Sequence, residues 1–263
     1  MGSIRLARLG NLDVACSSVV GQQFEKHSHD EFVIGANLLG EELIWLDGRS
    51  FTAGVGAITT YNPGEIQGGG ARAGLPWRYV SLYIPPEQLA IHLGQSSLQF
   101  ERPLQQAPGL ASELAQAVGL CLSDDALLRE RGEECVTLLL GRIASGAGVR
   151  LSAPRDAGSG AVRRLQELLA ARLEYTPSLD QMAAELGLSK FHLLRSFQRH
   201  TGLSPRQWAM QLRTRRAQGL LRQGFTAAEV AHTLGFADQS HLTRHFRAAY
   251  GLPPGRYQAL VRE

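Results

Sequence analysis

Short runs of β-branched and aromatic residues, separated by turn residues, dominate the first 85 positions of the chain. The clearest runs are Phe32–Ala36, Leu43–Leu46, Ala57–Tyr61 and Tyr79–Ile84. Such runs are typical of β-strands, and the pair Asp47-Gly48 after the second run is a two-residue hairpin signal. Many short strands with glycine-rich turns predict a small β-barrel or sandwich.

The hydrophobic period changes to three and four residues after Pro86, which predicts two amphipathic helices. The apolar positions at this spacing are Leu110, Leu114, Val118 and Leu122, followed by Leu127, Leu128, Cys135, Leu138 and Leu139. The second helix carries more apolar surface than packing against a small barrel requires. Two interpretations stay open, a core role within the domain and a homodimer interface.

A polar segment rich in Gly, Ser, Pro and Ala, residues 149–160, divides the chain. The charge changes sign there. Residues 1–160 hold 12 Lys and Arg against 17 Asp and Glu, a net charge of −5, whereas residues 161–263 hold 15 against 7, a net charge of +8. The composition therefore predicts a first domain over 1–148, a linker over 149–160 and a basic domain over 161–263 that meets a polyanion such as nucleic acid.

The basic domain contains an internal repeat of about 30 residues. Ala183, Leu186 and Gly187 match Ala231, Leu234 and Gly235 at an offset of 48, and Leu193, Arg195, Phe197, Gly202, Leu203, Pro205 and Trp208 match Leu242, Arg244, Phe246, Gly251, Leu252, Pro254 and Tyr257 at an offset of 49. Each copy has the pattern of a helix, a glycine-containing turn and a second helix. The repeat predicts two tandem helix-turn-helix (HTH) motifs.

The second helix of each copy has an apolar face and a face suited to DNA. Leu193 and Phe197, like Leu242 and Phe246, are spaced to face inward. The residues left facing outward are Lys190, Phe191, Leu194, Arg195, Gln198 and Arg199 in the first copy, and Gln239, Ser240, His241, Arg244, His245 and Arg247 in the second. Arginine can read guanine and apolar groups can contact thymine methyls in a major groove, so a DNA contact is favoured over a solvated polar face.

Residues 165–262 resemble the DNA-binding domain of the AraC/XylS family of bacterial transcription regulators. The most specific part is residues 230–254, VAHTLGFADQSHLTRHFRAAYGLPP, and residues 182–205, MAAELGLSKFHLLRSFQRHTGLSP, are similar to the family's first HTH motif. The resemblance implies that the two recognition helices enter successive major grooves. By matching position, Phe191, Leu194 and Arg195 would touch bases in one groove, and Gln239, Ser240, His241 and Arg244 in the next.

The same resemblance implies a connecting helix from Pro205 to about Arg222. Arg213 and Arg222 lie on this helix, and we expect that any contact they make with DNA is to phosphate rather than to bases. The chain departs from the family at Thr214, where such helices usually present an apolar residue.

The segment from His27 to Ile34 resembles the start of the cupin-like sensor domain that many of these regulators carry, and Tyr61–Glu65 resembles its later turn. His27 and His29 could ligate a metal. A cupin metal site also needs a downstream acidic residue and a third histidine, and Gln67 stands near the latter place. We therefore expect no bound metal and no cofactor. An effector site is expected instead, formed by His27, His29, Phe32, Trp45, Tyr61 and Tyr79, with the aromatic side chains as its walls.

These features predict an α+β multidomain chain: a cupin-like β-barrel with two helices, followed by an all-α domain with two HTH motifs. The expected function is a sequence-specific transcription regulator controlled by a small-molecule effector, without catalytic activity. Its expected partners are double-stranded DNA, a second copy of the chain and RNA polymerase. Two alternatives stay open, a metal-dependent cupin enzyme with a DNA-binding tail and a regulator whose barrel is purely structural.

Three further features of the sequence indicate where in the cell the protein is expected: its apolar stretches, its N-terminus and its cysteines. No stretch approaches the roughly 18 uninterrupted apolar residues of a spanning helix, and the N-terminus lacks a signal peptide's pattern. Three cysteines, Cys16, Cys121 and Cys135, lack metal-site or redox spacing. We therefore expect a cytoplasmic protein with reduced cysteines and no membrane contact.

Overall fold

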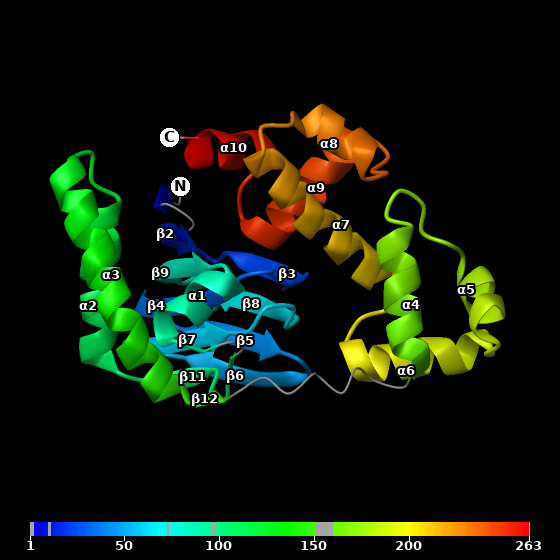
Figure 1. Cartoon of the computed structure of the whole chain (residues 1–263), viewed down its shortest axis with the longest axis horizontal. Coiled ribbons are helices and arrows are strands. Elements are labelled where there is room, and N and C mark those ends of the chain that lie inside the picture. Colours follow the sequence, from blue (N-terminus) through cyan, green and yellow to red (C-terminus); the bar gives the residue numbers. More distant parts are fainter. Residues whose placement is uncertain (1–2, 10–11, 73, 96–97, 151–159, 263) are drawn as a thin grey trace. The chain divides into compact units, whose positions relative to one another are not determined.

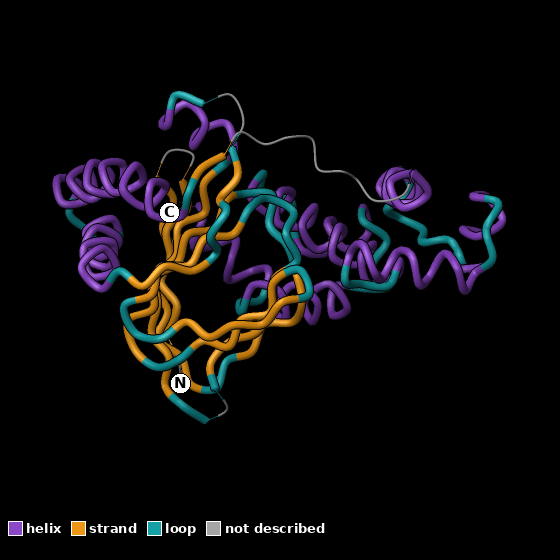
Figure 2. Tube along the Cα trace, turned by 90° about the horizontal axis from the view of Figure 1, so that it is seen from below, coloured by secondary structure: helices purple, strands orange, loops and turns teal. Residues whose placement is uncertain are grey.

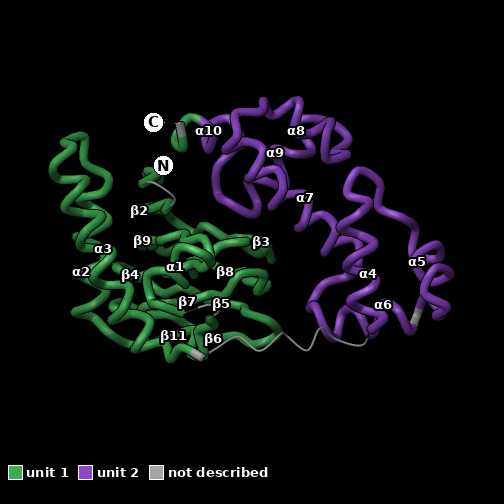
Figure 3. The backbone as a smooth tube through the Cα atoms, in the orientation of Figure 1, with its two compact units in different colours: residues 1–152, 259–263 green, residues 153–258 purple. Residues whose placement is uncertain are grey.

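The computed structural model describes residues 3–9, 12–72, 74–95, 98–150 and 160–262. The chain forms two compact units (Figure 3): unit 1 comprises residues 1–152 and 259–263, and unit 2 comprises residues 153–258. Most of the predicted linker, residues 151–159, lies outside the described residues. Its two ends belong to regular elements, since β12 ends at Arg150 and the first helix of unit 2 begins at Gly160.

The strands of unit 1 form antiparallel sheets (Figures 1 and 2). Their bounds are β1 Ser3–Leu9, β2 Leu12–Val20, β3 Gln23–His27, β4 Phe32–Leu39, β5 Glu42–Leu46, β6 Arg49–Ala53, β7 Ala57–Tyr61, β8 Gln67–Ala71, β9 Pro76–Ile84, β10 Gln99–Phe100, β11 Leu104–Gln106 and β12 Val149–Arg150. A six-stranded sheet has the order β1-β2-β9-β4-β7-β11, a four-stranded sheet has the order β3-β8-β5-β6, and β10 pairs with β12. The four strand runs expected from sequence are confirmed as β4, β5, β7 and β9.

The hairpin expected at Asp47-Gly48 is also confirmed. These two residues join β5 to β6, with φ of 44° at Asp47 and 89° at Gly48. Positive φ at both central positions is the requirement of the two-residue turn whose twist matches that of the flanking strands. Glycine adopts this conformation at no steric cost, and aspartate tolerates it better than most side chains.

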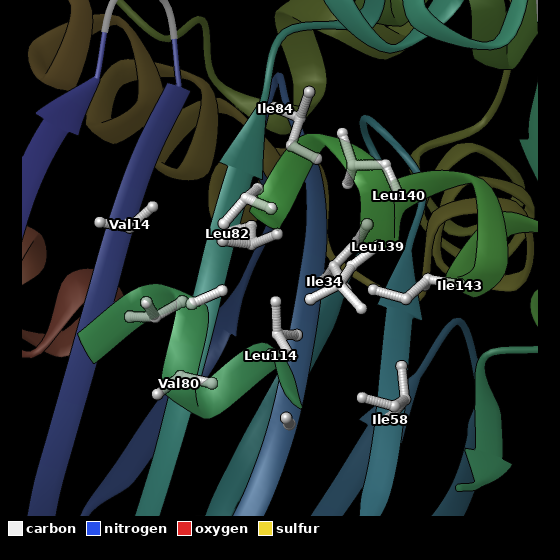
Figure 4. Packing of buried hydrophobic residues seen from close by; sticks show 14 of the residues in the cluster. Val14, Ile34, Ile58, Val80, Leu82, Ile84, Leu114, Leu139, Leu140 and Ile143 are labelled. Carbon is white, nitrogen blue, oxygen red and sulfur yellow. The ribbon is translucent and has the colours of Figure 1, made fainter. Parts of the chain in front are cut away.

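Helices cover one face of the six-stranded sheet. They are α1 Pro86–Leu93, α2 Pro108–Cys121 and α3 Ala126–Ala147, the last two as expected from the apolar period. Figure 4 shows Ile34 and Leu82 of the sheet beside Leu114 of α2 and Ile143 of α3, all of them fully buried. Burying each such side chain contributes roughly 1.5–3 kcal/mol, so this layer is the main core of the unit.

The opposite face of the six-stranded sheet packs against the four-stranded sheet. Two separate apolar clusters form there, one containing Val33, Ile44 and Tyr61 and the other containing Val19, Ala71 and Trp77. We call the region between the two sheets the inner space. The expected barrel is therefore realised as two facing sheets rather than one closed ring of hydrogen-bonded strands in the described part of the chain.

Unit 2 is all-helical. Its helices are α4 Gly160–Ala171, α5 Leu179–Leu186, α6 Lys190–Thr201, α7 Pro205–Arg222, α8 Ala227–Thr233 and α9 Gln239–Tyr250, and α10 Pro254–Arg262 follows at the C-terminal end of the chain. The two expected HTH motifs are thus α5-α6 and α8-α9, joined by α7. Across the described residues no helix is both long and apolar enough to cross a membrane.

Side-chain caps fix where these helices begin. Ser178, Ser204 and Thr226 each form a capping box with the Gln or Glu three residues later, at the starts of α5, α7 and α8. Ser189 and Asp238 cap the second helix of each HTH motif. Each cap satisfies backbone N–H groups that the first turn leaves unpaired, which stabilises the helix by about 1 kcal/mol.

Candidate functional site

The second helix of the first HTH motif, α6, is anchored by two side chains. Leu193 and Phe197 are 1% and 0% exposed, and the Phe197 ring meets Trp208 of α7 edge-on at 6.1 Å between centroids. This inward pair fixes the rotation of α6 about its axis. Arg195 is consequently exposed on the opposite side, together with Gln198 and Arg199, and Leu194 is half-buried.

The start of α6 carries a further positive charge. Nζ of Lys190 lies 3.1 Å from Oδ1 of Asp180 in α5, and both side chains are exposed. An exposed ion pair of this kind contributes at most about 1 kcal/mol, so Lys190 can exchange this partner for another anion at small cost.

The second HTH motif repeats this arrangement in α9. Leu242 and Phe246 are fully buried, while Gln239, Ser240, Arg244 and Arg247 are exposed. Arg195 and Arg244 therefore occupy equivalent, outward positions in the two motifs, as the sequence repeat predicts.

His241 differs from the other expected base contacts because it packs within its own motif. Its Nδ1 accepts a hydrogen bond from the backbone N–H of Ala237 at 3.2 Å, and its ring meets Phe236 edge-on at 5.6 Å. Its Nε2 lies 3.1 Å from Nε2 of His245. The imidazole thus supports the turn before α9 and is only half-exposed.

Arg213 of the connecting helix α7 is buried within unit 2. It is 7% exposed, and its guanidinium donates hydrogen bonds to the carbonyl of Leu173, to Oγ1 of Thr176 at 2.9 Å and to the carbonyl of Gly235 at 3.3 Å. Leu173 and Thr176 precede α5, whereas Gly235 is in the turn of the second HTH motif. Arg213 therefore ties the segment before the first motif to the turn of the second motif.

Backbone packing reinforces this tie. A Cβ at Gly235 would lie 2.1 Å from the carbonyl oxygen of Glu174, and Gly235 has a φ of +69°. The turn of the second motif is thus in direct contact with the segment after α4, at a position where glycine is required by space and by conformation.

Two other residues of α7 are also engaged inside unit 2. Nε of Arg222 donates to the hydroxyl of Tyr257 at 2.7 Å, which is a contact within unit 2. Thr214 is buried, and its hydroxyl donates to the carbonyl of Met210 at 2.9 Å. Because the hydroxyl has a partner, this polar departure from the family pattern fits the core.

Four of the six residues expected at an effector site lie at the inner space. Nδ1 of His27 donates to the carbonyl of Glu25 at 2.7 Å, and burial lowers the pKa of His27 to about 4, so the imidazole is neutral. Nε2 of His27 lies 3.1 Å from Nε2 of His29. Tyr61 belongs to one inner cluster, and Tyr79 stacks on Trp77 at 4.1 Å beside the other.

Phe32 and Trp45 lie elsewhere. Phe32 shares the parity of Ile34 on β4, so it points into the helix-covered core, where it meets Phe100 at 5.2 Å. Trp45 alternates with the inward residues Ile44 and Leu46, and Nζ of Lys26 lies 3.5 Å from its ring centroid. Aromatic character alone did not reveal which face of a strand each residue occupies.

One inner residue escaped the sequence interpretation. Glu42 begins β5 on the same face as Ile44 and Leu46, and burial raises the pKa of its carboxyl to about 8. The alternation Glu42, Ile44, Leu46 was the signal that could have placed it inside. Among the described residues, no group of three or more His, Cys, Asp or Glu side chains is arranged to hold a metal ion.

Comparison with known proteins identifies both parts of the chain. The family described as AraC-like ligand binding domain matches residues 11–136, and the family described as helix-turn-helix domain matches residues 182–259. The regulator YbfI of Bacillus subtilis is 25% identical over 225 residues, covering 84% of this chain and 82% of that protein. The regulator YidL of Escherichia coli is 27% identical over 183 residues, covering 69% of this chain and 59% of that protein.

The fold has solved counterparts. A crystal structure of ToxT from Vibrio cholerae with a bound unsaturated fatty acid superposes with a TM-score of 0.56 at 13% identity, covering 99% of this chain and 95% of that one. This likeness concerns the fold. The two family matches show that the chain belongs to the AraC family of transcription regulators, with a ligand-binding domain and a DNA-binding HTH domain.

Proposed function

We propose that α6 and α9 are the two DNA-reading helices and that Arg195 and Arg244 read base edges. The observation that carries this proposal is the equivalent exposure of these two arginines, each set by a buried leucine and phenylalanine on the opposite helix face. Lys190, Arg199 and Arg247 supply additional positive charge for the phosphates. Gln239 and Ser240 are placed for direct readout, and His241 acts mainly through the turn that it supports.

Effector control then requires that the ligand bind the two regulatory states with different affinity. We propose that an effector in the inner space shifts the population of states that present the two recognition helices to DNA, and that it contacts His27, His29, Tyr61 and Tyr79. The protein acts by binding alone, in the cytoplasm where the DNA is, and it influences RNA polymerase at the promoter.

The domain division is tested by a fragment. We propose that residues 161–263 fold and bind DNA without the sensor, because they contain both HTH motifs, α7 and the Arg213 contacts. The fragment is expected to show native helix content and to bind the full chain's operator at low salt. A helical fragment that does not bind this operator would show the division or the role to be wrong.

We further propose that the regulator is a homodimer through α3. Leu127 and Leu138 are both 76% exposed and lie 11 residues apart, which places them on the same face of the helix. Leu139, by contrast, is 5% exposed and belongs to the core. The sequence left open whether the apolar residues of this helix serve the core or a dimer interface. Leu139 serves the core, and we propose that the neighbouring Leu138 serves the interface.

A Leu138→Glu variant is expected to be monomeric, because a carboxylate would be buried without a partner in the interface. Light scattering at tens of micromolar compares it with the wild type and with Thr137→Glu, an exposed position of the same helix that points elsewhere. A wild-type monomer, or a dimer that survives Leu138→Glu, would remove this interface.

A further inference from the structure

The inner space contains a half-buried acid, Glu42, for which the described residues show no ion pair. The cross-strand partners of Glu42 are Ala53 on β6 and Ala71 on β8, and neither can form an ion pair or a side-chain hydrogen bond. Asp13, also inward, is different because Arg8 stands directly opposite it on β1. Glu42 is therefore the inner acid whose register partners offer no positive charge.

Small residues flank Glu42. Ala53 and Ala71 lie opposite it, and Gly69 is the next inward position of β8. Glu42 also falls between the two apolar clusters, since Ala53 belongs to one and Ala71 to the other. The residues Glu42, Tyr79 and Tyr83 are each half-buried, so part of their surface stays accessible.

Buried polar atoms without a protein partner lie in the inner space, and one of them is next to Glu42. Nδ2 of Asn37 donates to the carbonyl of Ala53 at 2.8 Å, next to Glu42, while its Oδ1 has no hydrogen-bond partner in the described structure. The same holds for Nε1 of Trp77, a residue that is 2% exposed, and for Oε1 of Gln67, which is 8% exposed. Buried polar groups nearly always have a partner, so these atoms point to a ligand or to water that completes them.

The charge of the surroundings favours one class of ligand. In the described strands the basic residues with inward parity are Arg8 and Arg49, and both are exposed on the edge strands β1 and β6. Burial keeps His27 neutral and raises the pKa of the Tyr61 and Tyr79 hydroxyls, to which the nearby Glu42 contributes. A bound carboxylate would thus find no buried cation, whereas a cation would find Glu42 and the half-buried ring of Tyr79, which stacks on Trp77.

We propose that the effector of this regulator is an organic cation with an ammonium group, which binds the Glu42 carboxylate beside the half-buried ring of Tyr79. This inference rests on the proposed function of the inner space as the effector site. The effector's apolar part packs against the two clusters, and Oδ1 of Asn37 offers an oxygen acceptor to the ammonium N–H groups.

The key variant, Glu42→Gln, is expected to fold. The carboxyl holds its proton to about pH 8 in the folded chain, so ionising it costs folding free energy that the unfolded chain does not incur. Stability of the wild type therefore falls as the pH rises from the unfolded value near 4.5 through 8. Glu42→Gln removes this loss, and its melting temperature is expected to exceed that of the wild type above pH 8.

The test uses three probes with the same phenyl tail and different heads: phenethylamine, 3-phenylpropionate and 2-phenylethanol. Their effect on the melting temperature of the full chain is measured at pH 8. Phenethylamine is expected to raise it, and the acid and the alcohol are not. The Glu42→Gln substitution is expected to weaken the binding of phenethylamine at least tenfold. Glu41→Gln is the matched control, because Glu41 is exposed, pairs with Arg72 at 3.5 Å and should leave the amine's effect unchanged.

Stabilisation by 3-phenylpropionate instead of the amine would overturn the inference. It would also be overturned if none of the three probes had an effect, or if Glu42→Gln bound the amine like the wild type. Operator binding is measured on the same preparation. A chain that binds its operator and not the amine is a regulator with another effector class, whereas a chain without specific DNA binding refutes the proposed function itself.

Discussion

Replacing Arg213 with methionine is expected to destabilise unit 2 by about 2–4 kcal/mol, because the half-buried Leu173, Thr176 and Gly235 lose the donor to their carbonyl and hydroxyl oxygens. Methionine has a similar length, so the loss reflects hydrogen bonds more than volume. For a domain of this size such a change lowers the melting temperature by roughly 10 °C or more. Thermal unfolding followed by circular dichroism measures it.

The same variant should affect DNA binding beyond its effect on folding. At temperatures where Arg213→Met is folded, the two HTH motifs lose a tie that sets their relative placement, so a site that needs both helices is bound more weakly. Arg216→Met is the matched control, since Arg216 is exposed on the same helix. Equal melting temperatures and equal operator affinities for the two variants would show that the Arg213 contacts do not hold the motifs.

Arg195→Ala and Arg244→Ala are each expected to weaken operator binding by about 1–3 kcal/mol, or roughly 5- to 150-fold, because arginine reads a guanine through two hydrogen bonds. Binding to random DNA is expected to change little, since phosphate contacts supply most of that affinity. Titrations of operator and random duplexes at several salt concentrations measure both effects.

Arg163→Ala serves as the control for these variants. Arg163 is an exposed arginine of α4 whose Nη1 lies 3.9 Å from a carboxylate oxygen of Glu167. Its loss removes the same charge from unit 2 without touching a recognition helix. If Arg195→Ala and Arg244→Ala lowered affinity for operator and random DNA alike, the two arginines would contribute only to the general positive charge.

Much of the fold could be predicted because it follows local periodicity. The four-residue spacing of Leu193 and Phe197, and of Leu242 and Phe246, predicted the inward faces of α6 and α9, and the caps and turns agreed with it. The hairpin at Asp47-Gly48 followed from turn chemistry in the same way. In each case residues close in sequence determine the result.

The remainder depended on contacts between distant segments. Arg213 meets Leu173 and Gly235, 40 and 22 residues away, and no local pattern distinguishes it from the exposed Arg216 on the same helix. Trp45 was expected at the effector site and Glu42 was not, yet Glu42 lies on the inward face of β5 and Trp45 on the other. Which face turns inward is set by the pairing of β5 with β6 and β8. The raised pKa of Glu42 likewise follows from its burial in the folded chain, which the sequence alone does not show.

The most direct test of the account crosses the arginine variants with single base-pair changes across an operator selected with the full chain. Wild type, Arg195→Ala and Arg244→Ala are titrated against each duplex. If α6 and α9 read successive major grooves, the affinity of each variant becomes insensitive to changes in a different short set of base pairs. The two sets are expected to lie about one helical turn, roughly 34 Å, apart. If both variants lost discrimination at the same base pairs, or at none, reading of DNA by α6 and α9 in successive grooves would be contradicted.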